Sequence, residues 1–91
     1  MTSNFIYMVY IKSGAEKQLK SLPRNYQKKI TDAILSLGGN PRPHGVRKLA
    51  GKDNLYRVRV GSYRIVYSIQ DDKLIVVVIR IGARRDIYRK L

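Results

Sequence analysis

Hydrophobic and polar residues alternate along Leu55–Tyr67, LYRVRVGSYRIVY, on both sides of a Gly-Ser pair. Such alternation predicts strands with one apolar face, and a Gly-X pair between them predicts a type II′ turn, because glycine readily adopts a positive φ at Gly61. Side chains alternate between the two faces of a strand, so Arg57, Arg59 and Arg64 fall on one face. The predicted cross-strand pairs are Val60–Tyr63, Arg59–Arg64, Val58–Ile65, Arg57–Val66 and Tyr56–Tyr67.

A strand and two helices are predicted before this hairpin. Asn4–Lys12 contains FIYMVYI, which predicts a strand covered at least partly on both faces. Ser13 followed by Glu16 is the pattern of a capping box at a helix start, and a proline ends or restarts that helix. A second helix is predicted from about Arg24 to Leu37, ended by two glycines. Its apolar stripe, which we expect to pack on a sheet, consists of Tyr26, Ile30, Ala33, Ile34 and Leu37.

The segments around the hairpin complete the predicted fold. Asn40–Asp53 contains several prolines and glycines and predicts a connection. This connection is expected to carry a secondary basic patch of Arg42, Arg47, Lys48 and Lys52. Asp71-Asp72 predicts a tight turn into Leu74–Ile81, LIVVVIRI, a run typical of a strand covered on both faces. The order β-α-α-β-β-β predicts an α+β fold. The length predicts a single domain over residues 1–91.

The charge balance favours a polyanionic partner. Nineteen Lys and Arg against six Asp and Glu give a net charge of +13, and a field of that size steers association with polyanions. A nucleic acid, a ribosome, an acidic protein or a membrane surface fits this charge, as does a basic surface that is only solvated. No apolar run approaches the roughly 20 residues of a membrane span, and the start lacks signal-peptide features. We therefore expect a cytoplasmic protein without a membrane partner.

Several other chemistries lack the residues that they need. The chain has no cysteine, which excludes disulfides, zinc fingers and a thiol nucleophile. The single histidine, His44, lies among prolines without a Cys, Asp or Glu nearby in sequence, which makes it a poor metal ligand. The acidic residues are scattered, so that no paired-carboxylate or metal site is predicted. We expect neither a metal nor another cofactor.

What remains is arginine beside tyrosine, in the hairpin and in the C-terminal ARRDIYRKL. A forked guanidinium matches phosphate oxygens at two points, and a tyrosine ring can stack on a base or exchange a proton. Fixed positive charge around a phosphodiester stabilises the pentavalent transition state. Cleavage by the 2′-hydroxyl of RNA would need neither a metal nor a covalent intermediate. The same surface also suits binding alone, to a nucleic acid or to an acidic protein.

Leu55–Tyr67 together with Gly82–Tyr88 resembles the RelE/ParE superfamily of toxins from type II toxin–antitoxin systems, and the resemblance extends over nearly the whole chain. Its most specific parts are YRVRVGSYRIVYSI at Tyr56–Ile69 and IGARRDIYRKL at Ile81–Leu91. The resemblance implies a RelE-like fold, with two N-terminal helices packed on a curved, largely antiparallel sheet and a basic concave face opposite. It also implies ribosome-dependent cleavage of messenger RNA by metal-independent attack of the 2′-hydroxyl, and a co-encoded acidic antitoxin that silences the toxin.

The resemblance also implies a role for individual residues. Arg57 and Arg59 fall where RelE toxins place basic residues that contact the scissile phosphate and help activate the 2′-hydroxyl. Arg64 falls on a phosphate-binding arginine. Arg84 falls on an arginine that stabilises the leaving group and transition state, and Tyr88 on a tyrosine that stacks on the substrate base. General electrostatic contacts to RNA or the ribosome are expected from Lys48, Lys52, Arg85, Arg89 and Lys90.

Two alternative functions share the same pattern. A ParE-like toxin inhibits DNA gyrase by protein–protein binding, and a catalytically impaired homologue keeps only antitoxin binding. Some RelE toxins have lysine at the positions of Arg57 and Arg59, and arginine does not give up its proton, so the sequence does not identify a general base. The tail tyrosine combined with strand arginines favours RelE-type activity.

Overall fold

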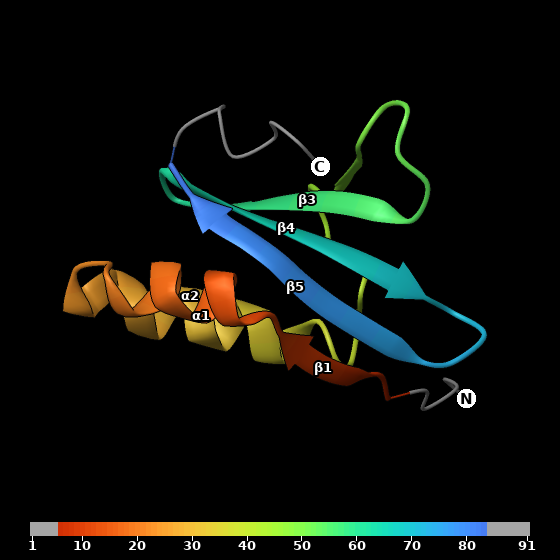
Figure 1. Cartoon of the computed structure of the whole chain (residues 1–91), viewed down its shortest axis with the longest axis horizontal. Helices are drawn as coiled ribbons and strands as arrows, with labels where there is room; N and C mark the ends of the chain where they lie inside the picture. The colour runs from red at the N-terminus through yellow and green to blue at the C-terminus, as the bar shows by residue number, and fades with distance from the viewer. Residues whose placement is uncertain (1–5, 84–91) are drawn as a thin grey trace.

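Two helices cover one face of a five-stranded sheet in the computed structural model, which describes residues 6–83 (Figure 1). In chain order the elements are β1 (Met8–Ile11), α1 (Ser13–Lys20), α2 (Arg24–Ser36), β2 (Arg47–Lys48), β3 (Leu55–Val60), β4 (Tyr63–Gln70) and β5 (Ile75–Gly82). No helix within this described part is long and apolar enough to cross a membrane.

The strand order is β1-β5-β4-β3-β2, with β1 parallel to β5 and every other neighbouring pair antiparallel. This confirms the predicted α+β fold with helices before a largely antiparallel meander. The short strand β2 lies inside Asn40–Asp53, where the sequence predicted only a connection, and that prediction was wrong in this part. Arg47 and Lys48 extend because β3 offers them a free edge, which is a tertiary cause that no local pattern reveals.

The hairpin of β3 and β4 has the register that the turn predicted. Val60 pairs with Tyr63, Arg59 with Arg64 and Arg57 with Val66, and the alternation continues to Tyr56 and Tyr67. Gly61 has a φ of +60°, as the first position of a type II′ turn requires. The three arginines therefore share one face of the hairpin, as predicted.

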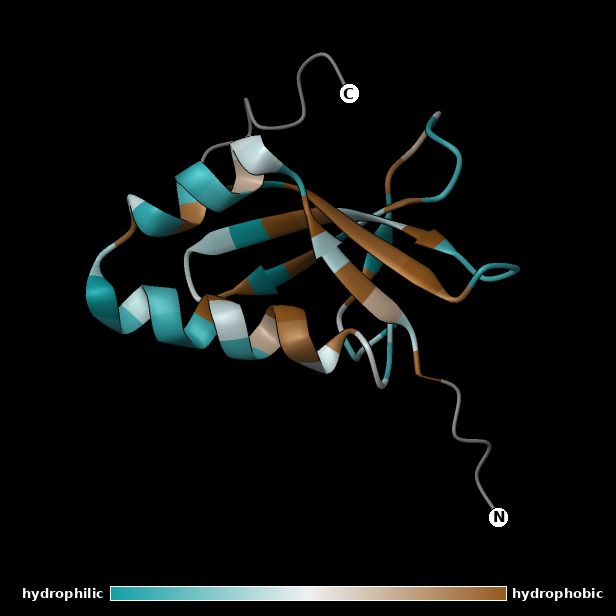
Figure 2. Ribbon diagram, turned by 60° about the horizontal axis from the view of Figure 1, so that its bottom comes forward, coloured by the Kyte–Doolittle hydropathy of each residue, from teal (hydrophilic) through white to brown (hydrophobic). Residues whose placement is uncertain are grey.

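The core lies between the helices and the face of the sheet opposite these arginines. Ile30, Ile34 and Leu37 from the predicted stripe are fully buried, and Figure 2 shows hydrophobic residues concentrated in the strands and toward the C-terminal end of α2. They pack with residues of the three long strands. The buried residues that the sheet contributes to this core come from β4 and β5, and partly buried residues of β3 pack against them. The buried ones are Ile65, Tyr67, Ile69, Val76, Val78 and Ile81.

Two features of the N-terminal segment differ from the predictions. The strand β1 is an edge strand, and Met8 and Tyr10 are 60% and 50% exposed, because no element within residues 6–83 covers the face opposite the helices.

The predicted capping box is absent. Ser13 is already helical, Lys12 is the N-cap, and no side chain caps this helix, because the Lys12 amide bonds the Val78 carbonyl and the strand leads directly into the helix.

Candidate functional site

A groove of about 410 Å³ opens between β2, the loop that follows it, and the hairpin of β3 and β4. Five of the residues that line it are basic, and none of the described lining residues is acidic. The basic residues are Arg47, Lys48, Arg57, Arg59 and Arg64, and the rest of the wall is Leu49 and Ala50. The three arginines predicted to act on phosphate thus line one surface, and Lys48 lines it with them.

Strand pairing arranges most of these side chains in two rows on the face opposite the helices. One row crosses Arg47, Arg57, Val66 and Arg80, and the other crosses Arg59, Arg64 and Gly82. Directly paired residues project to the same face, and like charges placed directly opposite one another destabilise a sheet. Val66 is fully buried although it belongs to the arginine face. A bound polyanion would relieve the repulsion between the arginines that are paired directly across the strands.

Arg80 is a basic residue of this face that the sequence analysis did not identify. Val76 and Val78 point into the core, so strict alternation would also direct Arg80 into the core. A β-bulge intervenes: Tyr67 pairs with Val78 while its neighbour Val66 pairs with Arg80. The extra residue reverses the alternation. A charged residue at a core position of an apolar strand was the signal that could have revealed the bulge.

The arginines of the groove have no carboxylate partner within residues 6–83. Both ion pairs in this part of the chain lie elsewhere, at Lys28–Asp32 and Arg42–Asp71. Arg64 instead donates from Nη1 to the Ala83 carbonyl oxygen at 2.7 Å. A carbonyl orients a guanidinium without neutralising it, because it carries no net charge. The charge of Arg64 therefore remains available to an anion in the groove.

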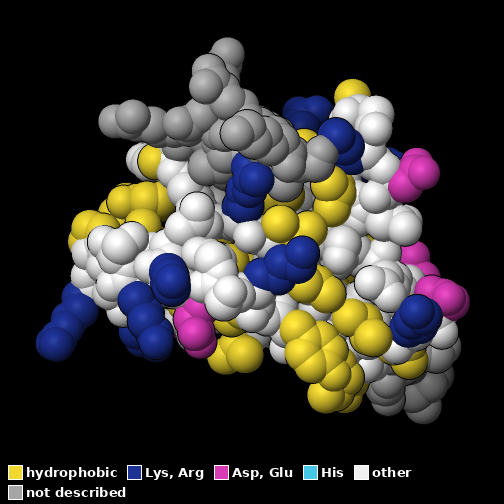
Figure 3. All heavy atoms as spheres, viewed as in Figure 1, with side chains coloured by type: hydrophobic (Ala, Val, Ile, Leu, Met, Phe, Trp, Pro, Cys, Tyr) yellow, Lys and Arg dark blue, Asp and Glu magenta, His cyan; other side chains and the backbone are white. Residues whose placement is uncertain are grey.

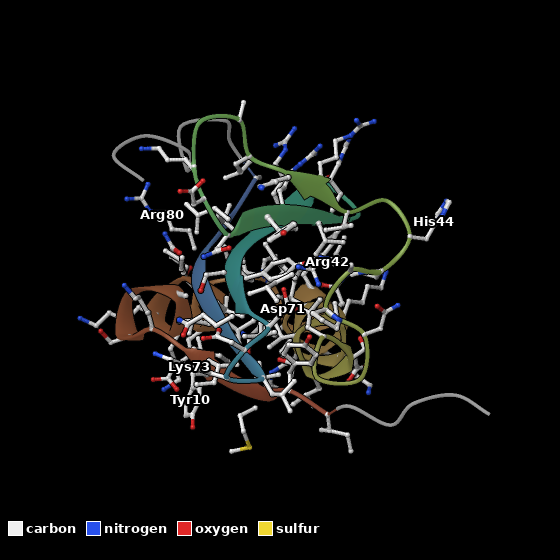
Figure 4. All side chains as sticks on the ribbon, turned by 90° about the vertical axis from the view of Figure 1, so that its right-hand side faces the viewer. Tyr10, Arg42, His44, Asp71, Lys73 and Arg80 are labelled. Atoms are coloured by element: carbon white, nitrogen blue, oxygen red, sulfur yellow. The ribbon has the colours of Figure 1, made fainter. Side chains whose placement is uncertain are left out.

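Arg42, expected in a secondary basic patch with Arg47, Lys48 and Lys52, does not belong to the groove. Its two terminal nitrogens donate to Asp71 at 3.0 and 2.8 Å (Figure 4). The Tyr7 hydroxyl donates to the same carboxylate at 2.6 Å. These bonds, with that from Arg42 first, lower the pKa of Asp71 to about 2. The guanidinium also lies over the Tyr56 ring. This cluster ties the loop after α2 to the β4–β5 turn.

A buried tyrosine lies beside the same cluster. Tyr67 stacks on Tyr56 with ring centroids 6.1 Å apart, and its hydroxyl donates to the Pro41 carbonyl at 2.8 Å. Burial raises the pKa of Tyr67 to about 12. Tyr67 therefore stays protonated at neutral pH and serves the fold by fixing the loop that leads to β2.

Of the remaining predicted site residues, one lies within the described part of the chain and the others lie in the tail. Lys52 is exposed in the loop before β3 and does not line the groove. His44 is exposed and points away from the molecule (Figure 4), and residues 6–83 contain no group of acidic, His or Cys side chains that could hold a metal. The tail residues lie outside the described part of the chain. They are Arg84, Arg85, Tyr88, Arg89 and Lys90.

The family comparison agrees with the fold. Residues 9–88 match the family described as the ParE toxin of the type II toxin–antitoxin system parDE. The chain belongs to the RelE/ParE toxin superfamily. It is thus a RelE-like toxin of a type II toxin–antitoxin system.

Individual members of the superfamily resemble the chain over most of their length. A protein from Methanocaldococcus jannaschii named RelE1 is 34% identical, covering 91% of this chain and 96% of the relative. The mRNA interferase toxin RelE of Escherichia coli K12 is 28% identical, covering 86% and 83%. The archaeal RelE–RelB complex from Pyrococcus horikoshii contains a chain that matches with a TM-score of 0.78 at 29% identity, covering 88% and 98%. The RelE-like fold is therefore confirmed.

Proposed function

We propose that this toxin is a ribosome-dependent endonuclease that cleaves messenger RNA and so inhibits translation. The observation that carries the proposal is the groove in which Arg57, Arg59 and Arg64 meet without a carboxylate partner among the described residues. Its charge suits a phosphodiester, because each guanidinium presents two donors to phosphate oxygens. The name mRNA interferase of the E. coli relative supports the same activity. This activity would take place in the cytoplasm.

The proposed reaction is an intramolecular transfer on the RNA. The 2′-hydroxyl gives up its proton to water, the 2′-oxygen attacks the adjacent phosphorus, and the bond to the 5′-oxygen breaks. The leaving 5′-oxygen takes up a proton from water, so the products are a 2′,3′-cyclic phosphate and a 5′-hydroxyl. Arg57 and Arg59 hold the scissile phosphate and favour the ionised 2′-oxygen by their charge, and Arg64 binds the phosphate. Arg84 stabilises the leaving oxygen, and Tyr88 stacks on a base. Positive charge held in place before the reaction stabilises the transition state without reorganisation.

The experiment is to add the free toxin to ribosomes that are translating a defined messenger RNA and to map the new RNA ends. The proposal expects 5′-hydroxyl ends at codons in the ribosome, and no cut where the nucleotide before the scissile bond carries a 2′-deoxy sugar. Messenger RNA that stays intact on the translating ribosomes would refute the endonuclease. Cleavage of the 2′-deoxy substrate would refute the mechanism.

A second function, inhibition of DNA gyrase, is favoured by the family description, which names the ParE toxin. It would act by protein–protein binding, and the basic surface would then meet an acidic surface of gyrase rather than RNA. A supercoiling assay with purified toxin and gyrase separates the two. An endonuclease leaves supercoiling unchanged, whereas loss of supercoiling with intact messenger RNA supports the ParE-like function. If both assays are negative and the antitoxin still binds, the chain is a catalytically impaired homologue.

We also propose that the partner in the resting state is a cognate antitoxin with an acidic and apolar binding segment. The toxin chain similar to this one in P. horikoshii was solved as a RelE–RelB complex. The sheet face of the groove continues to β1, where Met8 and Tyr10 are exposed, and Figure 3 shows hydrophobic side chains gathered over β1 and β5. A segment that covers both halves would shield the arginines and the apolar residues together.

A further inference from the structure

Gln18 makes an unusual contact between a helix and the edge of a strand. It is half-buried on α1, which packs beside β5 (Figure 1), and its Oε1 accepts a hydrogen bond from the Ile81 amide at 2.8 Å. The pairing of β1 with β5 ends at Ile11 and Val78, where the Lys12 amide bonds the Val78 carbonyl. Beyond that point Gln18 takes the place of a neighbouring strand.

The contact is specific to the register that β5 adopts after its bulge. Before the bulge, Val78 points into the core and its carbonyl faces β1. After it, Ile81 points into the core and its amide faces α1, while Arg80 joins the row of Arg57. A shift by one residue would reverse the side chains and the backbone groups together. The bond from Ile81 to Gln18 therefore forms only in the register that keeps Arg80 on the arginine face.

The same strand end holds the guanidinium of Arg64. Arg64 pairs with Gly82 across the sheet, and its Nη1 donates to the carbonyl of the next residue, Ala83, at 2.7 Å. Gln18 and Arg64 thus bind the backbone at the end of β5 two residues apart, at Ile81 and at Ala83. Gln18 does so from the helix layer and Arg64 from the sheet. Ile81 is fixed by a bond to the helix layer, and Ala83 in turn fixes the direction of the arginine.

We propose that Gln18 is a positioning residue for Arg64. By anchoring Ile81 it fixes the Ala83 carbonyl, and that carbonyl fixes where the guanidinium presents its remaining donors to the groove. The inference rests on the proposed phosphate-binding role of Arg64, since only that role makes the orientation matter for activity. A displacement of about 1 Å at a reacting group can cost roughly a hundredfold in rate. Loss of the Gln18 contact thus acts on the site although Gln18 lies in the helix layer.

Three variants test the proposal in the free full-length toxin. Gln18→Met keeps the length of the side chain and removes the acceptor, and Gln18→Glu keeps an acceptor oxygen at the same reach. Gln27→Met is the matched control, because Gln27 also makes polar side-chain bonds, to the Lys20 and Leu22 carbonyls at 3.1 and 2.8 Å. Those bonds join the two helices and do not touch β5.

The measurements are the side-chain Nε–H NMR resonance of Arg64, hydrogen exchange at the Ile81 amide, urea unfolding and the cleavage rate on ribosomes. Gln18→Met is expected to shift the Arg64 resonance, speed exchange at Ile81 and lower the cleavage rate by roughly tenfold or more. Gln18→Glu should restore all three. Gln27→Met should lower stability and leave the Arg64 resonance in place. If Gln18→Met does not fold, Gln18→Asn, which is one methylene too short, is judged by the same criteria.

An unchanged Arg64 resonance in Gln18→Met, or an equal shift in Gln27→Met, would overturn the proposal, because the glutamine would then be only a structural contact. Failure of the Gln18 proposal can be told apart from failure of the endonuclease proposal. If the wild-type toxin cuts no RNA but its Arg64 resonance depends on Gln18, the positioning role stands and the endonuclease falls. If RNA is cut and Gln18→Met changes neither the Arg64 resonance nor the cleavage rate, the endonuclease stands and the positioning role falls.

Discussion

Arg64 illustrates how a single side chain can be both fixed and chemically available. It donates to a backbone carbonyl, at 2.7 Å, and within residues 6–83 it forms no ion pair. We expect Arg64→Ala to reduce cleavage by roughly 10²–10³-fold, the cost of losing one preorganised donor to a transition-state anion. RNA end mapping on ribosomes measures the loss. Circular dichroism checks that the fold is retained.

The control for this prediction is Arg24→Ala, which removes the same charge from an exposed position at the start of α2. Its cleavage rate should stay near that of the wild type. Equal losses in the two variants would mean that only the net charge of +13 matters. Full activity of Arg64→Ala would remove Arg64 from the site.

The carboxylate of Asp71 gives the fold a defined sensitivity to acid. Its hydrogen bonds from Arg42 and Tyr7 lower its pKa to about 2 in the folded state, against about 3.9 in an unfolded chain. Because the folded pKa is the lower one, the stabilisation is present above about pH 4 and is lost as the pH falls through about 2. Urea unfolding between pH 5 and pH 2 should show this loss.

Asp71→Asn is the variant that tests this assignment. An amide cannot ionise, so the variant should be less stable than the wild type at pH 5, and the difference should shrink toward pH 2. Asp72→Asn is the control, because Asp72 is the exposed neighbour in the same turn and takes part in neither ion pair of residues 6–83. The same acid profile in the wild type and in Asp71→Asn would show that other carboxylates govern it.

At the scale of elements, the hairpin of β3 and β4 depends on one glycine. Gly61 has a φ of +60°, and a Cβ added there would lie 3.2 Å from Cε1 of Tyr26. We expect Gly61→Ala to lower the free energy of unfolding by about 1–2 kcal/mol, the cost of a left-handed conformation for a residue with a Cβ. Urea unfolding measures the change. Gly14→Ala is the control, because a Cβ there would meet nothing within 4 Å.

For Gly14→Ala, in the first turn of α1, no loss of stability is expected, and a gain of up to about 1 kcal/mol would follow from the better helix propensity of alanine. Equal stability of Gly61→Ala and the wild type would show that the turn tolerates a side chain. The hairpin register would then rest on the strands alone rather than on Gly61.

The hairpin was predictable because its causes are local: alternation sets the faces, and Gly61 sets the register. The features that were missed have causes in other parts of the chain. The strand β2 forms on the free edge of β3, and Arg80 reaches the arginine face only through a bulge. The predicted capping box does not form, because the Lys12 amide is bound to β5. Arg42 does not join the predicted basic patch, because it is hydrogen-bonded to Asp71, which lies 29 residues further along the chain.

At the scale of the whole molecule, the sheet face opposite the helices is divided in two. Its β2–β4 half carries the arginines that line the groove, and its β1 half exposes Met8 and Tyr10. RNA phosphates suit the basic half alone. An antitoxin that must shield the arginines and also bind tightly gains from both halves, since apolar area supplies affinity that charge in water does not.

This division predicts that toxicity and neutralisation can be separated by mutation. Tyr10 is 50% exposed and pairs with Val77, which places it on the open face beyond the arginines. Tyr10→Glu should raise the dissociation constant of the antitoxin by roughly ten- to a hundredfold, because it removes a buried aromatic contact and adds a charge of the same sign as an acidic partner. Its cleavage of messenger RNA should stay near the wild-type rate.

Binding of the antitoxin is measured by calorimetry and cleavage by RNA end mapping, with Leu35→Glu as the control. Leu35 is 66% exposed but lies on α2, in the helix layer, so the same charge change there should leave the antitoxin affinity unchanged. If Tyr10→Glu binds as tightly as the wild type, the β1 half is not part of the antitoxin interface. If it loses cleavage as well as binding, the two halves are not independent and RNA or the ribosome also contacts β1. Loss of binding alone would yield a toxin that still cuts RNA and escapes its antitoxin.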